Sequence, residues 1–262
     1  MPEVVASNAE RSRNITVLAW RIGLTVGFLA AWQYMGSKSD FWKLIVSSPQ
    51  QVILKCFQWV QDPVWWGHVG TTLEEAILGY LLGVVVALVL VAILAPSPWI
   101  SRFMSPFLAA MNALPKIALA PLFIFWFGTT LQSKVYFVAS LISFIVLYGV
   151  LTGIRTIDPI MLANTRLHGA SKWDLVLHVY IPAIITWLFS SLRLSWAWAL
   201  LAAVVGEYLG SIKGLGFLIA SAEQSLQADI VIAGILVVAI AAVAFDRLLV
   251  YVERPMNKWR AF

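Results

Sequence analysis

The residues that could carry out catalysis or hold a metal are few and widely spaced in this chain. Its three histidines, His68, His168 and His178, form no H-E-x-x-H zinc motif, and the single cysteine, Cys56, excludes a cysteine-rich zinc or iron–sulfur site. No G-x-x-x-x-G-K-S/T loop is present to bind the phosphates of ATP. We therefore expect a protein that is not an enzyme, with no catalytic residue, no metal site and no cofactor of its own.

A different kind of chemistry is indicated by Arg193, which lies in the apolar run WLFSSLRLSWAWALL. A charge inside a membrane is costly, so an intramembrane arginine is a candidate functional residue. On a helix Ser190, Arg193 and Trp196 or Ala197 share one face, which could line a pathway and attract an anionic solute. The alternative is an arginine bonded to a neighbouring helix or to backbone carbonyls.

Lys116 and Glu207 raise the same question. Lys116 follows Pro115 at a point where an apolar helix should break, so its side chain either reaches the membrane surface or faces a pathway. Glu207 ends another apolar stretch, where it could act in gating, pair with a charge or be solvated. Beside it, Gly214 and Gly216 in KGLGFL predict a tight turn rather than a phosphate site.

The elements that must position these charges are membrane helices. The chain has 262 residues, of which 61% are hydrophobic and only 12% charged, with a mean hydropathy of +0.85. Because a helix needs about 20 apolar residues to cross a bilayer, we predict an all-α polytopic membrane protein with about six spans. The predicted spans are residues 15–36, 72–95, 103–127, 135–152, 183–206 and 228–250.

The third of these spans should be kinked or split, because Pro106, Pro115 and Pro121 divide it. Outside the spans, the residues after Ser48 and Pro49 predict a short helix lying on the membrane, with a substrate lid as the alternative.

The basic residues favour cytoplasmic termini under the positive-inside rule, since ten of them then flank the spans on the cytoplasmic side and five on the outer side. This distribution accounts for the net charge of +5 without any nucleic-acid partner. The cytoplasmic group comprises Arg11, Arg13, Arg102, Arg155, Arg166, Lys172, Arg247, Arg254, Lys258 and Arg260. The outer group comprises Lys38, Lys43, Lys55, Lys134 and Lys213.

A polar segment between two spans, residues 155–182, is too long for an ordinary helix connection. Asp158 is placed to cap a helix over 159–167 with Pro159 at its first position, and a second helix is predicted over 171–180. Together the two pieces would form a knob, with Gly169 allowing the turn between them and Pro182 ending it and starting the fifth span.

The spacing in this knob resembles a known signature. After Gly169 come nine residues and then Val179, Tyr180, Ile181 and Pro182, which is similar to the E-A-A-x-x-x-G-x9-I-x-L-P signature in the membrane-spanning subunits of ABC importers. The three positions of E-A-A hold Ala163, Asn164 and Thr165 instead. The resemblance implies ATPase coupling through Ala163, Asn164, Thr165, Arg166, His168, Gly169, Ala170, Val179, Ile181 and Pro182.

Two further stretches, ALPKIALAPLFIFWFG at 113–128 and VGEYLGSIKGLGFLI at 205–219, resemble the branch that imports nitrate, bicarbonate, aliphatic sulfonates, taurine and thiamine-pyrimidine precursors. The resemblance covers about residues 70–252 and implies a type I importer permease fold. We accordingly expect one transmembrane domain over 1–262, with the importer core at about 70–252.

In function, the resemblance implies a bacterial inner-membrane permease that imports a small, anionic solute by alternating access. Its partners would be two ATPase subunits holding ATP and Mg, a periplasmic or lipid-anchored substrate-binding protein, membrane lipid and a second permease copy. A homodimer is preferred and a heterodimer is the alternative. The small-residue pairs Gly79/Gly83 and Ala202/Gly206 would pack within a protomer or between protomers. The alternative function is an ion-coupled secondary transporter, which should carry carboxylates within its spans and inverted halves.

Overall fold

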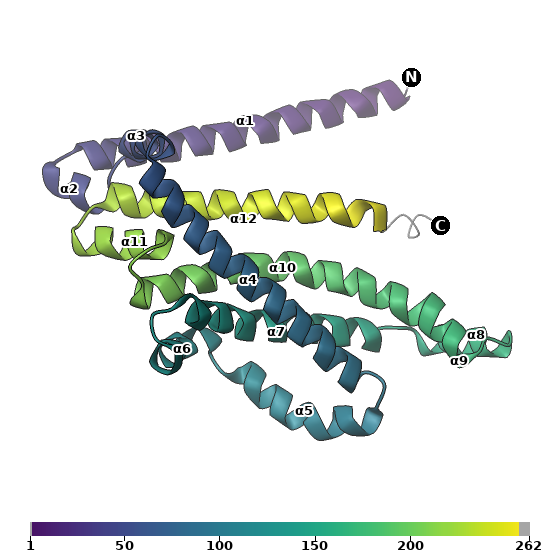
Figure 1. The fold of residues 1–262 in the computed structure, drawn as a ribbon. Coiled ribbons are helices and arrows are strands. Elements are labelled where there is room, and N and C mark those ends of the chain that lie inside the picture. Colours follow the sequence, from purple (N-terminus) through teal and green to yellow (C-terminus); the bar gives the residue numbers. More distant parts are fainter. Residues whose placement is uncertain (1, 257–262) are drawn as a thin grey trace. The chain divides into compact units, whose positions relative to one another are not determined.

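The computed structural model describes residues 2–256, and the side chains of residues 15–97, 99–171 and 173–253. All regular elements in this range are helical (Figure 1), as predicted for an all-α protein. The α-helices are α1 Pro2–Ser37, α2 Asp40–Ile45, α3 Pro49–Val60, α4 Pro63–Leu94, α5 Pro98–Ala113, α6 Ala120–Phe127, α7 Leu131–Arg155, α8 Pro159–Leu167, α9 Lys172–Leu175, α10 Ile181–Gly210, α11 Leu215–Gln224 and α12 Ala228–Met256. A 3-10 helix, η1, covers Lys116–Leu119, and a π-helix, η2, covers Val176–Tyr180.

Some of the basic residues used to orient the chain lie outside this description. Lys258 and Arg260 fall outside the described residues, and the side chains of Arg11, Arg13, Lys172 and Arg254 are not described. The cytoplasmic placement of the termini therefore stays a prediction.

Among the described residues, five helices are long and apolar enough to cross a membrane, and six spans result if a bent pair counts as one. The bent pair is Trp99–Ala113 with Lys116–Phe127, whose axes differ by 81°. The break predicted from prolines is thus confirmed, and it lies at Leu114 and Pro115. Pro106 is tolerated inside α5, and Pro121 lies in the first turn of α6, where its missing N–H costs little.

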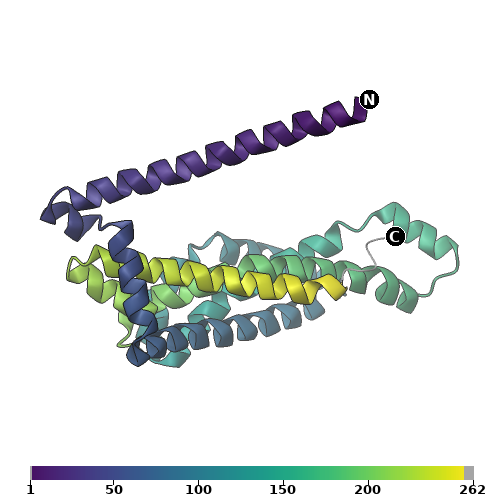
Figure 2. The same ribbon diagram turned by 90° about the horizontal axis from the view of Figure 1, so that it is seen from above.

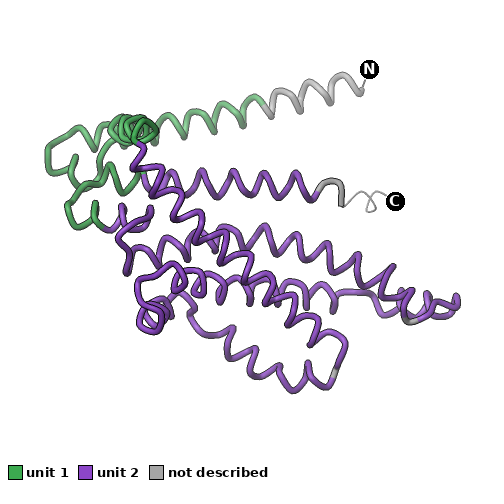
Figure 3. The backbone as a smooth tube through the Cα atoms, in the orientation of Figure 1, with its two compact units in different colours: residues 1–62, 221–233 green, residues 63–220, 234–262 purple. Residues whose placement is uncertain are grey.

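The backbone divides into two compact units, residues 1–62 with 221–233 and residues 63–220 with 234–262 (Figure 3). Within the first unit, Trp32 Nε1 donates a hydrogen bond to the carbonyl of Val46 (3.1 Å), and Lys55 lies 4.0 Å from Asp229. The short helix predicted after Ser48 is present as α3, and the Ser48 hydroxyl accepts from the N–H of Gln51 (3.4 Å).

The second unit is built on α4, α7 and α10, which run side by side in Figures 1 and 2 and contact one another. Gly79 and Gly83 of α4 allow this close approach. A Cβ on Gly79 would lie 2.5 Å from the Cβ of Val138, and one on Gly83 would lie 2.8 Å from the carbonyl oxygen of Ala139. The first small-residue pair therefore packs α4 against α7 within the protomer.

Candidate functional site

The predicted knob is present and begins at α8, which projects with α9 at one end of α7 and α10 (Figure 2). Asp158 is the N-cap of α8: its carboxylate accepts a hydrogen bond from the N–H of Ile160 (2.8 Å), and Pro159 is the first helical residue. These two residues do what the sequence predicted, because an N-cap carboxylate satisfies an N–H that the first helical turn leaves unpaired.

Gly169 closes α8 with a Schellman motif. The N–H of Ala170 donates to the carbonyl of Thr165 (3.3 Å), and the N–H of Gly169 donates to that of Arg166 (3.0 Å). Gly169 has a φ of +86°, as predicted for this turn, and a Cβ placed on it would meet nothing within 4 Å. The turn needs glycine for its backbone conformation and not for space.

The second helical piece is capped by its own side chains. The carboxylate of Asp174 accepts from the N–H (2.8 Å) and the hydroxyl (2.6 Å) of Ser171, and the Ser171 hydroxyl accepts from the N–H of Asp174 (3.2 Å). This is a reciprocal cap of the S-x-x-E/Q kind, with aspartate in the acidic position. The knob therefore holds its shape through local contacts at both pieces.

Pro182 lies where the knob passes into the fifth span, as predicted. The chain passes from α9 through the π-helical turn η2 directly into α10, which starts at Ile181 with Pro182 in its first turn. The missing N–H of proline is tolerated there, so no break is required. Val179, within η2, is buried, and Ile181 is partly exposed.

Most of the coupling residues on α8 and its C-terminal turn are exposed, including Ala163, Asn164, Arg166 and His168. The sequence did not lead us to predict three exposed apolar residues of the knob, Ile160, Leu167 and Trp173. Leu167 is 84% exposed, Trp173 70% and Ile160 68%. Ile160, Ala163 and Leu167 lie three and four residues apart, which places them on one helix face. That spacing was the signal that could have found them.

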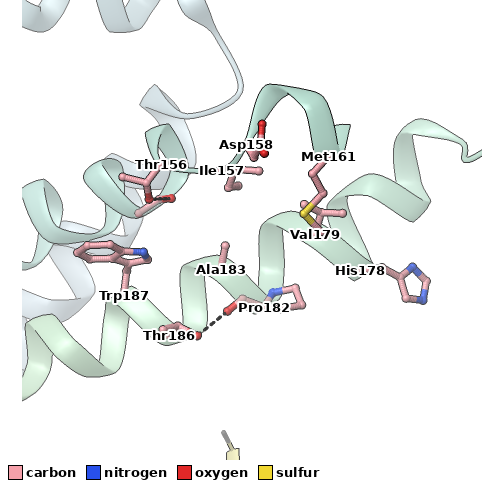
Figure 4. Close-up of a pocket in the computed structure, with 11 residues that line it drawn as sticks. Thr156, Ile157, Asp158, Met161, His178, Val179, Pro182, Ala183, Thr186 and Trp187 are labelled. Atoms are coloured by element: carbon pink, nitrogen blue, oxygen red, sulfur yellow. Dashed lines mark hydrogen bonds between the residues drawn. The ribbon is translucent and has the colours of Figure 1, made fainter. Parts of the chain in front are cut away.

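A pocket of about 340 Å³ lies between α8 and the start of α10 (Figure 4). Its walls include Asp158 and Met161 at α8, Val179 in η2, and Pro182 and Trp187 in α10, and Met161 reaches toward Val179. The pocket therefore separates α8 from η2 and the start of α10.

Arg193 is bonded to a neighbouring helix. Its Nε lies 3.1 Å from Asp246 Oδ1, and a terminal nitrogen lies 3.6 Å from Glu253 Oε2, both on α12. Ser190 and Arg193 line one pocket of about 220 Å³ together with Glu253. The predicted neighbours Ser190 and Arg193 therefore do share a face.

Trp196 does not belong to that face, so its assignment to the pathway is corrected here. It is 1% exposed, and its ring stacks on Phe245 with centroids 3.7 Å apart and meets Tyr80 edge-on at 5.5 Å. Buried aromatic residues of this kind stabilise the packing of helices and do not line an open channel.

Lys116 lies at the break in the third span. Its ammonium donates to the carbonyl (3.3 Å) and the side-chain oxygen (3.5 Å) of Asn112 and lies 5.0 Å from the ring centroid of Phe144. It also lines an apolar pocket with Trp198 of α10.

Glu207 is 1% exposed, which excludes the solvated alternative for this carboxylate. Its oxygens lie 2.7 and 2.9 Å from the hydroxyl of Thr72 on α4. The turn after α10 closes over it: the N–H of Gly216 donates to Glu207 (2.7 Å), that of Leu215 to Thr72 (2.8 Å), and that of Gly214 to His68 Nδ1 (3.0 Å). Three successive N–H groups are therefore held by side chains of α4 and α10.

The glycines in this turn leave room for that carboxylate. Gly214 has a φ of +115°, and a Cβ on it would collide with the Glu207 carboxyl group. A Cβ on Gly216 would collide with the carbonyl of Val204. The predicted tight turn is confirmed, and it brings the backbone of Gly214 and Gly216 against the buried carboxyl group of Glu207.

Two more buried charges, Glu75 and Lys134, lie beside Glu207. Lys134 was expected to flank a span on the outer side, but its side chain is only 2% exposed. Its ammonium lies 3.9 Å from Glu75, donates to the carbonyl of Thr129 (3.0 Å) and reaches the hydroxyl of Ser211 (3.3 Å). Glu75 and Lys134 are distant in sequence, so no local pattern could have paired them.

A bundle of apolar helices with one broken span and a projecting helical knob defines a polytopic membrane protein of the transporter class. The sequence profile of the "Binding-protein-dependent transport system inner membrane component" family matches residues 79–258. The chain belongs to this family. It is the permease subunit of an ABC importer, an inner-membrane transport component and not an enzyme, and a secondary transporter is not favoured.

Two full-length relatives support this membership. The riboflavin transport system permease protein RibX of Chloroflexus aurantiacus is 32% identical over 261 residues, covering 96% of this chain and 95% of the relative. The taurine transport system permease protein TauC of Escherichia coli is 26% identical over 257 residues, covering 95% and 91%.

Solved structures agree on the fold. The chain matches an amino acid ABC transporter with a TM-score of 0.63 at 19% identity, covering 77% of this chain and 97% of the other. It matches the MetNI methionine ABC transporter in an inward-facing conformation with a TM-score of 0.52 at 18% identity, covering 71% and 93%. The predicted type I importer permease fold is confirmed.

Proposed function

We propose that the knob formed by residues 155–182 docks on a separate ATPase subunit and transmits its closure to the membrane helices. The observation that carries this proposal is a surface that is both preorganised and apolar. Ile160, Leu167 and Trp173 are more than two-thirds exposed on pieces that are capped locally. Large apolar side chains left exposed between the predicted spans are typical of a protein contact.

The full assembly follows from this role. Two ATPase subunits would bind ATP and Mg and close around them, and a periplasmic or lipid-anchored binding protein would deliver the solute from the other side. The permease would pair with a second copy, as a homodimer, to enclose the pathway, with both termini in the cytoplasm. Family membership supports the need for a binding protein, because the family is described as binding-protein-dependent.

The cargo we propose is a small organic anion such as a sulfonate, with nitrate and bicarbonate as smaller anions of the same charge. Support comes from the relative named for taurine, which carries a sulfonate, and from the cations in the membrane helices of this chain. Another relative is named for riboflavin, which is a larger ring system.

Co-purification with an ATPase tests the docking role. The permease is expressed with candidate ATPases as the unaltered chain, as Leu167→Asp, as Gly169→Trp and as Ile212→Asp. Ile212 is the matched control because it is 90% exposed but lies outside the knob. We expect the first two changes to abolish ATPase association while the permease still folds, and Ile212→Asp to retain it. Equal association of all four proteins would contradict the docking role.

A further inference from the structure

The break between α5 and η1 opens onto a pocket of about 370 Å³. This volume is within the range of small-molecule sites in proteins. Broken helices inside a membrane are where transported solutes commonly bind, because the backbone there needs polar neighbours. The pocket is lined by Leu114, Pro115, Lys116, Ile117, Leu141, Ile145, Leu194 and Trp198.

Lys116 is the only charged residue in this lining. Its situation differs from that of Lys134, which lies 3.9 Å from Glu75, and from that of Arg193, which lies 3.1 Å from Asp246. Among the described side chains, no carboxylate lies within salt-bridge distance of Lys116. Only the neutral oxygens of Asn112 and the ring of Phe144 face its ammonium group. An anion at this position would therefore meet an uncompensated positive charge.

The rest of the pocket is apolar and comes from the break itself, from α7 and from α10. Leu141 and Ile145 lie on α7, and Leu194 and Trp198 lie on α10. Leu194 is 63% exposed and Trp198 41% exposed, so both offer apolar surface that a bound molecule would cover. A fully hydrated inorganic ion gains nothing from such walls, whereas an anion with a hydrocarbon body does.

We propose that this pocket binds the transported solute, and that it selects organic anions carrying one negative charge on an apolar body. Lys116 holds the anionic group, and Leu194 and Trp198 contact the hydrocarbon part. The proposal rests on the proposed function, since it places the cargo of that importer at a named site. It narrows the cargo class to aliphatic or aromatic sulfonates and carboxylates, and it ranks nitrate and bicarbonate below them.

Binding of pentanesulfonate and methanesulfonate to the assembled permease–ATPase complex tests this site. The complex is placed in phosphatidylcholine nanodiscs, and dissociation constants are measured by calorimetry for the unaltered protein, Lys116→Met and Lys116→Arg. Lys43→Met serves as the control for loss of a charge, because Lys43 is half exposed and pairs with Asp40 elsewhere in the chain. Pentanol serves as the uncharged probe.

We expect pentanesulfonate to bind more tightly than methanesulfonate, and Lys116→Met to weaken it by about ten-fold or more. Lys116→Arg should recover most of the affinity, and Lys43→Met should leave it unchanged. Trp198→Ala should weaken pentanesulfonate more than methanesulfonate. Binding of pentanol should not respond to Lys116→Met.

Equal affinity of Lys116→Met and the unaltered complex would overturn the proposal, as would no binding of either sulfonate to the unaltered complex. If phosphatidylglycerol in the nanodisc displaces pentanesulfonate, the pocket holds a lipid headgroup and the proposal is also overturned. Each of these results leaves ATPase association intact, so failure of this site is distinct from failure of the coupling role.

Discussion

Two turns, one between α8 and α9 and one after α10, need the same glycine conformation in opposite surroundings. Gly169 has a φ of +86° and open space around it, whereas Gly214 has a φ of +115° and the Glu207 carboxyl group against it. The turn at Gly169 is held only by local hydrogen bonds, while residues 214–216 are held by side chains of α4 and α10. The turn at Gly214 is fixed by contacts with α4 and α10, whereas the turn at Gly169 is fixed only by its own backbone and leaves its surface uncovered.

Replacing each glycine by alanine should give the largest difference between the two turns. Gly214→Ala combines an unfavourable φ with a collision against a buried carboxyl group, and should cost about 3 kcal/mol or more. Gly169→Ala meets only the unfavourable φ and should cost about 1 kcal/mol. Thermal unfolding followed by size-exclusion chromatography measures both. Equal losses would mean that Gly214 does not touch a fixed group.

Lys134 is buried near Glu207, whereas Arg193 is partly exposed on α10, so removing each charge should affect stability differently. Lys134→Met leaves the buried Glu75 without its cation and should cost about 3–5 kcal/mol. Arg193→Met breaks a pair in which both side chains are about 40% exposed, and should cost about 1 kcal/mol or less. Denaturant titrations of the two variants compare them. A larger loss for Arg193→Met would contradict the burial difference.

Thr72 and Thr165 provide a matched pair of hydroxyl groups. Thr72 is fully buried, contacts Glu207 and accepts from the N–H of Leu215, so Thr72→Val should cost about 1–3 kcal/mol. The hydroxyl of Thr165 bonds only to the carbonyl of Met161 one turn earlier, so Thr165→Val should change stability by about 0.5 kcal/mol or less. Unfolding midpoints under identical conditions test this. Similar shifts in the unfolding midpoints of the two variants would show that the turn at residues 214–216 does not depend on Thr72.

The smallest effect should come from the cap of α8. Asp158→Ala removes the acceptor for the Ile160 N–H and should weaken the helix by about 1 kcal/mol without changing the unfolding temperature of the whole chain. Hydrogen exchange should speed up for amides at the start of α8 and stay constant in α7. Faster exchange throughout both helices would mean that the knob is part of the bundle and does not fold by itself.

Local features were predictable from the sequence, while contacts between distant residues were not. Asp158, Pro159 and Gly169 follow rules that act within one helical turn, and all three were found as predicted. The break near Pro115 was predictable for the same reason.

The contacts that join His68, Thr72 and Glu207 to residues 214–216 could not be predicted, because they connect α4 to the turn after α10. Thr72 lies 135 residues from Glu207, and Asp246 lies 53 residues from Arg193. Helical periodicity left Trp196 and Ala197 open as neighbours of Arg193: Trp196 stacks on Phe245, whereas Ala197 is exposed. Spacing along a helix specifies a face, but packing decides what covers it.

Cross-linking from the knob and from the turn after α10 tests the central claim that the knob is the surface that meets the ATPase. In a Cys56→Ser background, Leu167→Cys and Ile212→Cys are each labelled with a benzophenone maleimide, since both positions are more than 80% exposed. We predict that illumination joins the ATPase to the permease labelled at position 167 and not at position 212. An ATPase cross-link from position 212, or none from position 167 in an intact complex, would contradict the account.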